Sequence, residues 1–236
     1  NMSSNIKTLM KDIVAEHESK RKSELIALQN QINPHFLYNT LDIIVWMIEN
    51  EQKEDAVKVV TALARFFRIS LSRGKNIITV SDELEHVKNY LTIQKMRFKN
   101  KFIFSFDIDE NVKKLGTIKL ILQPLVENAI YHAMEFMDGD GEIKIKCWIE
   151  NNNLKFLISD NGCGMTEETL KSLLSETQPK SKKGSGVGVL NVQQRIQLFF
   201  GQEYGLKIKS EPDEGTDIII TMPAIEYDIL KQRGLE

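Results

Sequence analysis

The chain has 236 residues, of which 42% are apolar and 27% charged, as in an ordinary soluble globular protein of one or two domains. Its 31 lysines and arginines against 33 aspartates and glutamates give a formal net charge of -2, so we expect no nucleic acid as a partner. The two cysteines, Cys147 and Cys163, are too few for a disulfide framework and favour a reducing compartment. No apolar run reaches the roughly 18 residues that span a bilayer, although attachment through an upstream segment stays open.

The first hundred residues carry apolar side chains at three- and four-residue spacing, which predicts helices. One stripe runs through residues 5–50, with a polar interruption at 17–24, and a second follows the polar turn at 49–55. Two helices joined by a short turn form an antiparallel hairpin that cannot cover its own apolar face. We therefore expect a homodimer, in which two hairpins make a four-helix bundle. A third helix is predicted to begin at Ser81, a good N-cap residue.

After residue 98 the pattern alternates between strands and helices. Strands are predicted at residues 102–108, 143–147, 154–160, 206–210 and 216–222, and helices at 117–134, 166–174 and 187–200. The Ser-, Lys- and Gly-rich segment 175–186 is predicted to be mobile. Hairpin-linked strands and helices in this order favour an α/β sandwich with one helical layer on one sheet. The fold class is therefore predicted as α+β, a dimeric helical hairpin followed by an α/β sandwich.

The motif D-x-G-x-G begins at Asp160, at the end of a strand that is predicted to be buried. A carboxylate there can accept a hydrogen bond from an exocyclic amine such as that of adenine. Gly162 and Gly164 then let a flat base approach the backbone. A tight turn explains the same pattern.

Gly184, Gly186 and Gly188 alternate just before a predicted helix. Backbone N–H groups in such a segment can face an anion, and the helix N-terminus adds positive potential. The spacing fits neither a P-loop nor the dinucleotide fingerprint. A flexible linker is an equal explanation.

Asn128 and His132 lie four residues apart on a predicted helix and share one face of it, with Glu127 beside them. A carboxamide oxygen suits Mg²⁺, which takes few protein ligands and completes its shell with phosphates and water. A polar edge on an amphipathic helix is the alternative.

The run N-P-H-F-L-Y-N occupies residues 33–39 of the first long helix. A proline inside a helix costs about 3 kcal/mol, which calls for a local reason. A reactive His35 directly after Pro34 is one candidate, and a structural histidine is the other.

Taken together and in order, these motifs resemble the sensor histidine kinases, whose ATP-binding domain belongs to the gyrase/Hsp90/histidine-kinase/MutL superfamily. The LytS/YesM-type branch is recognised by Q-x-N-P-H-F-L-Y-N-T-L, which this chain carries at residues 31–41. Residues 90–98, 123–132 and 187–200 are similar to that branch as well, and a Gly-Thr pair opens the last predicted strand. The likeness runs from about residue 25 to residue 223.

The resemblance implies roles in the helical half. His35 matches the phosphoacceptor, and Asn39, one helical turn later, matches a position that supports dephosphorylation of the partner. For Asn39 the alternative is a hydrogen bond to the carbonyl that Pro34 leaves unpaired. In the larger histidine-kinase class an acid follows the phosphoacceptor, whereas this chain has Phe36.

The resemblance also implies a site for ATP and Mg²⁺. Its residues are Asn128 as the Mg²⁺ ligand, Glu127 and His132 near the phosphates, Asp160 for adenine, Gly162 and Gly164 for the base pocket, Gly184, Gly186 and Gly188 around the triphosphate, and Thr216, which helps to hold Asp160 and adenine through water. Gyrase-like relatives have a glutamate four residues before the Mg²⁺ asparagine. Pro124 stands there in this chain, so Glu127 is the nearest substitute.

The resemblance divides the chain into a connector helix (1–24), a dimerisation and histidine phosphotransfer domain (25–80) and an ATP-binding domain (81–236). It implies transfer of the phosphate to an aspartate of a response-regulator receiver domain. It also implies a cytoplasmic location in a bacterial protein that an upstream sensor segment anchors in the membrane. Two rival functions are an ATPase that drives conformational change and a non-catalytic dimerisation module. The first would not need the N-P-H-F-L-Y-N helix, and the intact nucleotide motifs argue against the second.

Overall fold

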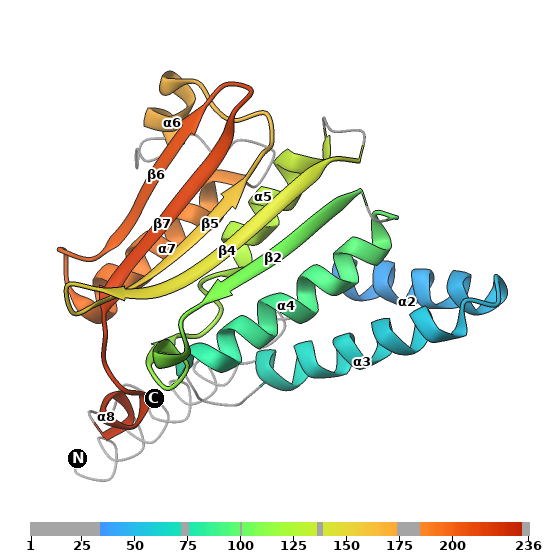
Figure 1. Ribbon diagram of the computed structural model, residues 1–236, viewed down its shortest axis with the longest axis horizontal. Coiled ribbons are helices and arrows are strands. Elements are labelled where there is room, and N and C mark those ends of the chain that lie inside the picture. Colours follow the sequence, from blue (N-terminus) through green and yellow to red (C-terminus); the bar gives the residue numbers. More distant parts are fainter. Residues whose placement is uncertain (1–33, 72–75, 100, 136–138, 174–184, 233–236) are drawn as a thin grey trace, which may run out of the picture. The chain divides into compact units, whose positions relative to one another are not determined.

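The computed structural model describes residues 34–71, 76–99, 101–135, 139–173 and 185–232. The chain separates into two compact units, residues 1–56 and 57–236, each described by itself below. In the first unit, helix α2 (Pro34–Glu49) is followed by a turn and by the start of helix α3 (Lys53–Ser70) (Figure 1). The predicted pair of helices joined by a short turn is confirmed for residues 34–49 and 53–70, and the part of the first predicted helix before Pro34 lies outside the described residues. Whether Pro34 lies inside a longer helix depends on residues outside the described range.

Helix α2 is apolar on more than one side. Its buried side chains, Phe36, Thr40, Ile44 and Met47, recur every three or four residues, as in an amphipathic helix. Further large apolar side chains of α2 are exposed, namely Tyr38, Leu41, Val45, Trp46 and Ile48. Among the described residues of one chain, an apolar surface of this helix is therefore left uncovered.

The second unit is built on a mixed five-stranded sheet in the order β2-β4-β5-β7-β6. Its strands are β2 (Phe102–Ile108), β4 (Gly141–Glu150), β5 (Asn153–Asp160), β7 (Gly215–Pro223) and β6 (Gly205–Glu211). Strand β2 pairs with β4 in parallel, and the other neighbours are antiparallel. Each strand predicted by alternation is present, because every second side chain is buried along β4, β5 and β7.

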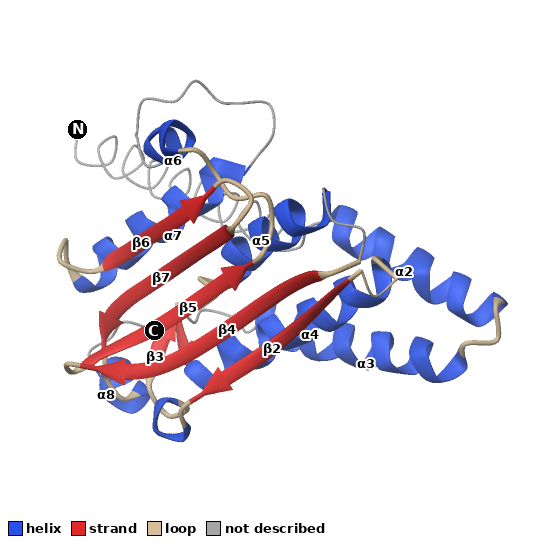
Figure 2. Cartoon of the chain, turned by 45° about the horizontal axis from the view of Figure 1, so that its top comes forward, coloured by secondary structure: helices blue, strands red, loops and turns tan. Residues whose placement is uncertain are grey.

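Helices α4 (Val80–Arg97), α5 (Gln123–Glu135) and α7 (Ser185–Phe200) form one layer on one face of this sheet (Figures 1 and 2). The core lies between the two layers. It contains fully buried Ile143, Ile145, Leu154 and Phe156 from the sheet and Leu125, Val126 and Ile196 from the helices. Burial of each such side chain contributes about 1.5–3 kcal/mol. The predicted α/β sandwich with one helical layer is confirmed.

Smaller elements complete the unit. They are the antiparallel pair β1 (Ile77–Thr79) and β3 (Gly116–Ile118), the 3-10 helix η1 (Glu110–Val112), and helices α6 (Glu167–Leu173) and α8 (Tyr227–Gln232). No helix in the described part of the chain combines the length and the apolar character needed to cross a membrane.

The helix predicted at residues 117–134 begins later than expected. Residues 116–118 form β3 instead, and Leu120 has a left-handed backbone with a φ of 58°. The chain thus turns before α5 starts at Gln123, and Pro124 falls in the first helical turn, where its missing N–H costs nothing.

The helix predicted from Ser81 begins at Val80, and its N-cap is Thr79. The extended backbone of Thr79 (φ -71°, ψ 151°) lets its side-chain oxygen accept from Asp82 N at 3.0 Å. The cap is therefore two residues earlier than predicted.

Glu83 connects α4 to the loop before α5. The side chain is fully buried and accepts hydrogen bonds from Leu120 N (2.8 Å) and Leu122 N (2.9 Å). From α7, Arg195 Nη2 donates to Lys119 O at 2.5 Å. Burial raises the pKa of Glu83 to about 7, while the backbone N–H groups and Arg195 oppose the shift. The start of α5 is therefore held from two neighbouring helices.

The C-terminal part of α3 packs into the second unit, so the packing boundary differs from the predicted functional boundary at residues 80/81. The ring of Phe66 stacks on His86 with 4.3 Å between centroids. Lys119 Nζ donates to Ser70 O at 2.7 Å, and Ser70 Oγ lies 2.8 Å from His86 Nε2. These contacts join the end of α3 to α4 and to the loop before α5.

Candidate functional site

One face of α5 presents the polar residues of the site. Gln123, Glu127 and Asn128 are half-buried, whereas Leu125, Val126, Ala129 and Ile130 on the opposite face are buried. Helix α5 packs on β4, β5 and β7, so its apolar face is directed to the sheet and its polar stripe to the other side. His132 lies on the same helix, and its side chain is outside the described residues.

The Glu127 carboxylate is held by two donors. Gln123 Nε2 donates to Glu127 Oε1 at 2.8 Å, and the Tyr90 hydroxyl of α4 donates to the same carboxylate. Burial raises the pKa of Glu127, and both hydrogen bonds oppose that shift. The carboxylate therefore has a set orientation next to Asn128.

Asp160 ends β5 and is only 9% exposed. It pairs with Thr216 across the β5–β7 ladder, and its Oδ1 accepts from Gly162 N at 3.0 Å. Burial raises the pKa of Asp160 to about 6, and the charge of Asp217 adds to this, while the N–H groups of Gly162 and Thr216 lower it. A buried carboxylate at the end of the central strand is thus poised to accept a hydrogen bond from a bound group.

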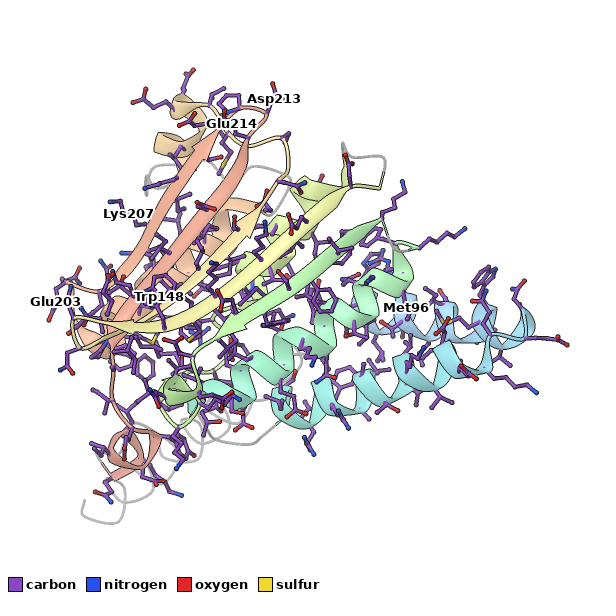
Figure 3. All side chains as sticks on the ribbon, viewed as in Figure 1. Met96, Trp148, Glu203, Lys207, Asp213 and Glu214 are labelled. Atoms are coloured by element: carbon purple, nitrogen blue, oxygen red, sulfur yellow. The ribbon has the colours of Figure 1, made fainter. Side chains whose placement is uncertain are left out.

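The backbone at Gly164 requires glycine. Its φ is 60°, and a Cβ on this residue would overlap the carbonyl oxygen of Glu211 in β6. The β6–β7 turn closes on the same loop, because Asp213 N donates to Cys163 O at 2.8 Å. Figure 3 labels Asp213 at the tip of that turn. The D-x-G-x-G segment is therefore fixed against the β6–β7 hairpin.

Ser210 is a site residue that the sequence analysis missed. Its hydroxyl donates to Gly215 O at 2.9 Å and accepts from Met165 N at 2.8 Å. The proton of Ser210 is thereby used, so at 2.9 Å the Thr216 hydroxyl is the donor to Ser210 Oγ. Thr216 Oγ1 consequently keeps acceptor capacity beside Asp160.

Asn161 was missed as well. Its Oδ1 accepts from Glu142 N at 2.6 Å, and its Nδ2 donates to Asp140 O at 2.9 Å. The side chain therefore pins the start of β4 beside the end of β5. An asparagine directly after a strand-ending aspartate is the signal that sequence reasoning had available.

The glycines before α7 are distributed differently from the prediction. Helix α7 begins at Ser185, so Gly186 and Gly188 belong to its first turn, and the predicted mobile segment 175–186 is wrong at its last two residues. A Cβ at Gly188 would lie 3.3 Å from Pro124 Cβ, which shows that the first turns of α7 and α5 adjoin. Gly184 and the preceding lysine-rich stretch lie outside the described range.

His35 and Asn39 lie in the first unit, apart from the residues described so far. His35 is exposed on α2, and Asn39 Nδ2 lies 3.2 Å from both of its ring nitrogens. The second unit brings together Asp160, Thr216 and the Gly164 loop at the end of the sheet. No distance relates this group to His35.

The second unit combines the buried Asp160 carboxylate, the loop with the glycine-only position Gly164, and the first turn of α7. These features are typical of a nucleotide-binding domain. A model of the "Histidine kinase-, DNA gyrase B-, and HSP90-like ATPase" family matches residues 115–226, and a "Histidine kinase" model matches residues 23–102. The chain therefore belongs to the histidine kinase family.

The relatives YesM and LytS agree with this family. The sensor histidine kinase YesM of Bacillus subtilis is 40% identical over 94% of this chain and 37% of its own length. The sensor protein LytS of Bacillus anthracis is 35% identical over 89% of this chain and 36% of its own length. A solved catalytic domain of the histidine kinase ThkA aligns with a TM-score of 0.48 at 19% identity, covering 63% of this chain and 95% of that chain. The chain spans little more than a third of the length of YesM and LytS.

Proposed function

We propose that this chain is the kinase core of a sensor histidine kinase, which transfers the γ-phosphoryl group of ATP to His35 and then to an aspartate of a response-regulator receiver domain. The observation that carries the proposal is the buried Asp160 carboxylate, which lies opposite Thr216 and beside the glycine-only position at Gly164. The proposal joins this nucleotide site to an exposed histidine in the N-P-H-F-L-Y-N helix. The relatives YesM and LytS, which are named as a sensor histidine kinase and a sensor protein, support the proposal.

The adenine base binds at the end of β5. Asp160 accepts a hydrogen bond from the exocyclic amine, and Thr216 Oγ1 accepts a second one directly or through water. Gly162 and Gly164 leave room for the base along the backbone. The Ser210 contacts hold Thr216 in position for this role.

The triphosphate lies between the first turns of α5 and α7. The N-terminus of α7, which begins at Ser185, favours an anion, and we place Gly184, Gly186, Gly188 and His132 beside the phosphates. Asn128 would hold Mg²⁺, with the Glu127 carboxylate next to it. Both offer hard oxygen donors on the half-buried face of α5, and this set fits the ion's preference. When bound, Mg²⁺ neutralises charge on the phosphates.

His35 acts as the nucleophile. A ring nitrogen with its lone pair forms a bond to the γ-phosphorus as the bond from phosphorus to the bridging oxygen breaks, and ADP leaves. The exposure of His35 on α2 gives it access to a nucleotide bound by the second unit of its own or a partner chain.

Partners and location follow from the same proposal. The exposed apolar side chains of α2, among them Val45 and Ile48, are suited to cover the same face in a second copy, giving a homodimer. Residues 1–24 serve as a connector, 25–80 as the dimerisation and phosphotransfer domain, and 81–236 as the ATP-binding domain. An upstream membrane-embedded sensor places this chain in the cytoplasm of a bacterium.

The test is labelling with γ-labelled ATP. We expect label on the protein that is labile in acid and stable in base, as a phosphohistidine is. His35→Gln should abolish it while leaving the affinity for ATP within about threefold, or roughly 0.6 kcal/mol. Release of free phosphate without labelled protein would identify an ATPase instead. If neither free phosphate nor labelled protein forms, the chain is a non-catalytic dimerisation module.

A further inference from the structure

A chain of buried hydrogen bonds runs from α4 to the site face of α5. Gln94 Nε2 donates to the Tyr90 hydroxyl oxygen at 2.7 Å. Tyr90 in turn donates to the Glu127 carboxylate, which also accepts from Gln123 at 2.8 Å. The Glu127 carboxylate therefore accepts hydrogen bonds from side chains of two helices, α4 and α5.

The direction of these bonds is determined by Gln94. A tyrosine hydroxyl has one proton, and an N–H donor on the oxygen leaves that proton for another acceptor. With Gln94 donating, the Tyr90 proton is directed to Glu127. Hydrogen bonds in such a chain strengthen one another because each donor polarises the next.

Packing alone does not account for this arrangement. Tyr90 and Gln94 are each 5% exposed, and Gln94 Oε1 has no hydrogen-bond partner among the described residues. A buried polar atom without a partner lowers stability, so apolar side chains of similar size would fold at least as well here. The feature common to both polar groups is that their chain of hydrogen bonds ends on Glu127.

Glu127 has three side-chain rotors, and an unheld carboxylate samples many orientations. Holding it before the nucleotide binds removes the entropic cost of ordering it in the reaction. Fixing the carboxylate in this way speeds the chemical step more than it strengthens ATP binding, because the contacts to adenine and most contacts to the phosphates are made elsewhere.

We propose that Tyr90 and Gln94 are positioning residues for phosphoryl transfer, which act by fixing the orientation of the Glu127 carboxylate beside Asn128. This inference rests on the proposed function. It adds two residues of α4 to a nucleotide site otherwise built from α5, α7 and the sheet.

The first experiment measures autophosphorylation rates of Tyr90→Phe and Gln94→Leu. Tyr90→Phe keeps the ring and its contact with Phe66, 5.9 Å between centroids, and removes only the hydroxyl. We expect kcat to fall about tenfold, with KM for ATP within about twofold. The matched control is Thr92→Val, on the same helix, whose hydroxyl donates to Lys88 O at 2.8 Å and has no link to Glu127. An unchanged kcat in Tyr90→Phe would overturn the proposal.

A double-mutant cycle tests whether the effect passes through Glu127. In a Glu127→Gln background, measured by single-turnover labelling, adding Tyr90→Phe should change the rate less than about twofold. A full tenfold loss in that background would show that Tyr90 acts elsewhere and would overturn the inference.

A third measurement does not depend on activity. With ¹³C-labelled glutamate, the carboxyl carbon signal of Glu127, assigned by its loss in Glu127→Gln, should move in Tyr90→Phe and stay in Thr92→Val. An unmoved signal in Tyr90→Phe would refute the positioning role. Absence of phosphohistidine in the parent would refute the proposed function instead, so the two failures are distinguishable.

Discussion

Asn39 Nδ2 lies 3.2 Å from both ring nitrogens of His35, one turn further along α2. The two side chains thus form one polar pair on the helix, and His35 is exposed. A receiver domain that presents its aspartate to His35 must meet Asn39 as well. A carboxamide can hold a water in line for attack on an acyl phosphate although it has no useful basicity.

Asn39→Ala should therefore slow the loss of phosphate from the regulator about tenfold or more, while autophosphorylation stays within about threefold. Both rates are measured on the same preparation, together with the melting temperature. A joint fall of both rates and of the melting temperature would make Asn39 a structural residue.

Asp160→Asn should weaken ATP binding about 10- to 100-fold, because the adenine amine loses a charged acceptor worth roughly 1.5–3 kcal/mol. In the parent the affinity for ATP should also fall as the pH drops below about 6, because the pKa of Asp160 is raised to about 6 and the carboxylate becomes protonated there. The variant should lack this pH dependence. Calorimetry at pH 7.5 and 5.5 gives both results.

The matched control for Asp160 is Asp217→Asn. Asp217 follows Thr216 in β7, so it points to the opposite face of the sheet, and it influences Asp160 only through its charge. We expect ATP affinity at pH 7.5 within about twofold of the parent. Normal binding by Asp160→Asn would show that the base binds elsewhere.

Gly164→Ala should lower the free energy of unfolding by roughly 2–5 kcal/mol and abolish ATP binding, because the backbone is left-handed and a Cβ meets Glu211 O. Gly139→Ala is the control. That residue also has a positive φ, 119°, but a Cβ there meets nothing within 4 Å, so the cost should be only about 1 kcal/mol. If denaturant unfolding shows that both variants lose the same free energy of unfolding, the overlap of a Cβ at Gly164 with Glu211 O is contradicted.

His86→Phe should make the fold less sensitive to acid. Burial lowers the pKa of His86 from 6.5 to about 3, and nearby Lys119 adds to this. Between these values the unfolded chain binds a proton that the folded chain excludes, so His86 costs the parent about 1.4 kcal/mol per pH unit below about 6.5. At pH 7.5, the ring of a phenylalanine can keep the stacking on Phe66.

Thermal or urea unfolding at pH 7.5 and pH 5 measures this effect. As the pH falls from 7.5 to 5, the free energy of unfolding of His86→Phe should rise relative to that of the parent. Glu83 lies on the same helix with its pKa raised to about 7, so its own contribution is present in acid and lost as the pH rises. It is common to both proteins and cancels in the comparison.

Local patterns predicted most of the fold. Alternation located every strand of the five-stranded sheet, since it reports directly which side chains face the helical layer. The apolar run before α5 was misread as helix because it fits either period. Its geometry depends on Glu83, which accepts from Leu120 and Leu122 across a long stretch of sequence.

The chemistry of the site was predictable only in part. Asp160, Asn128 and the glycines stand in short motifs, so a single sequence reveals them. Ser210, which accepts from Met165 N and contacts Thr216 through its hydroxyl, belongs to no such motif. Tyr90 opens the family-like stretch 90–98, but that stretch does not indicate its contact with Glu127. Their roles arise from packing between elements, and that information is not carried by spacing along the chain.

The antiparallel pairing of β5 with β7 sets Asp160 opposite Thr216, although α6, α7 and β6 lie between them in the chain. Their separation in space is determined by ladder register rather than by the length of the intervening segment. Residues can therefore be inserted or deleted after α6 without moving Asp160 and Thr216, the two residues that are proposed to contact the base. On the proposed function, the sequence between α6 and α7 is thus free to diversify, while the Asp160–Thr216 pair that is proposed to recognise adenine stays constant.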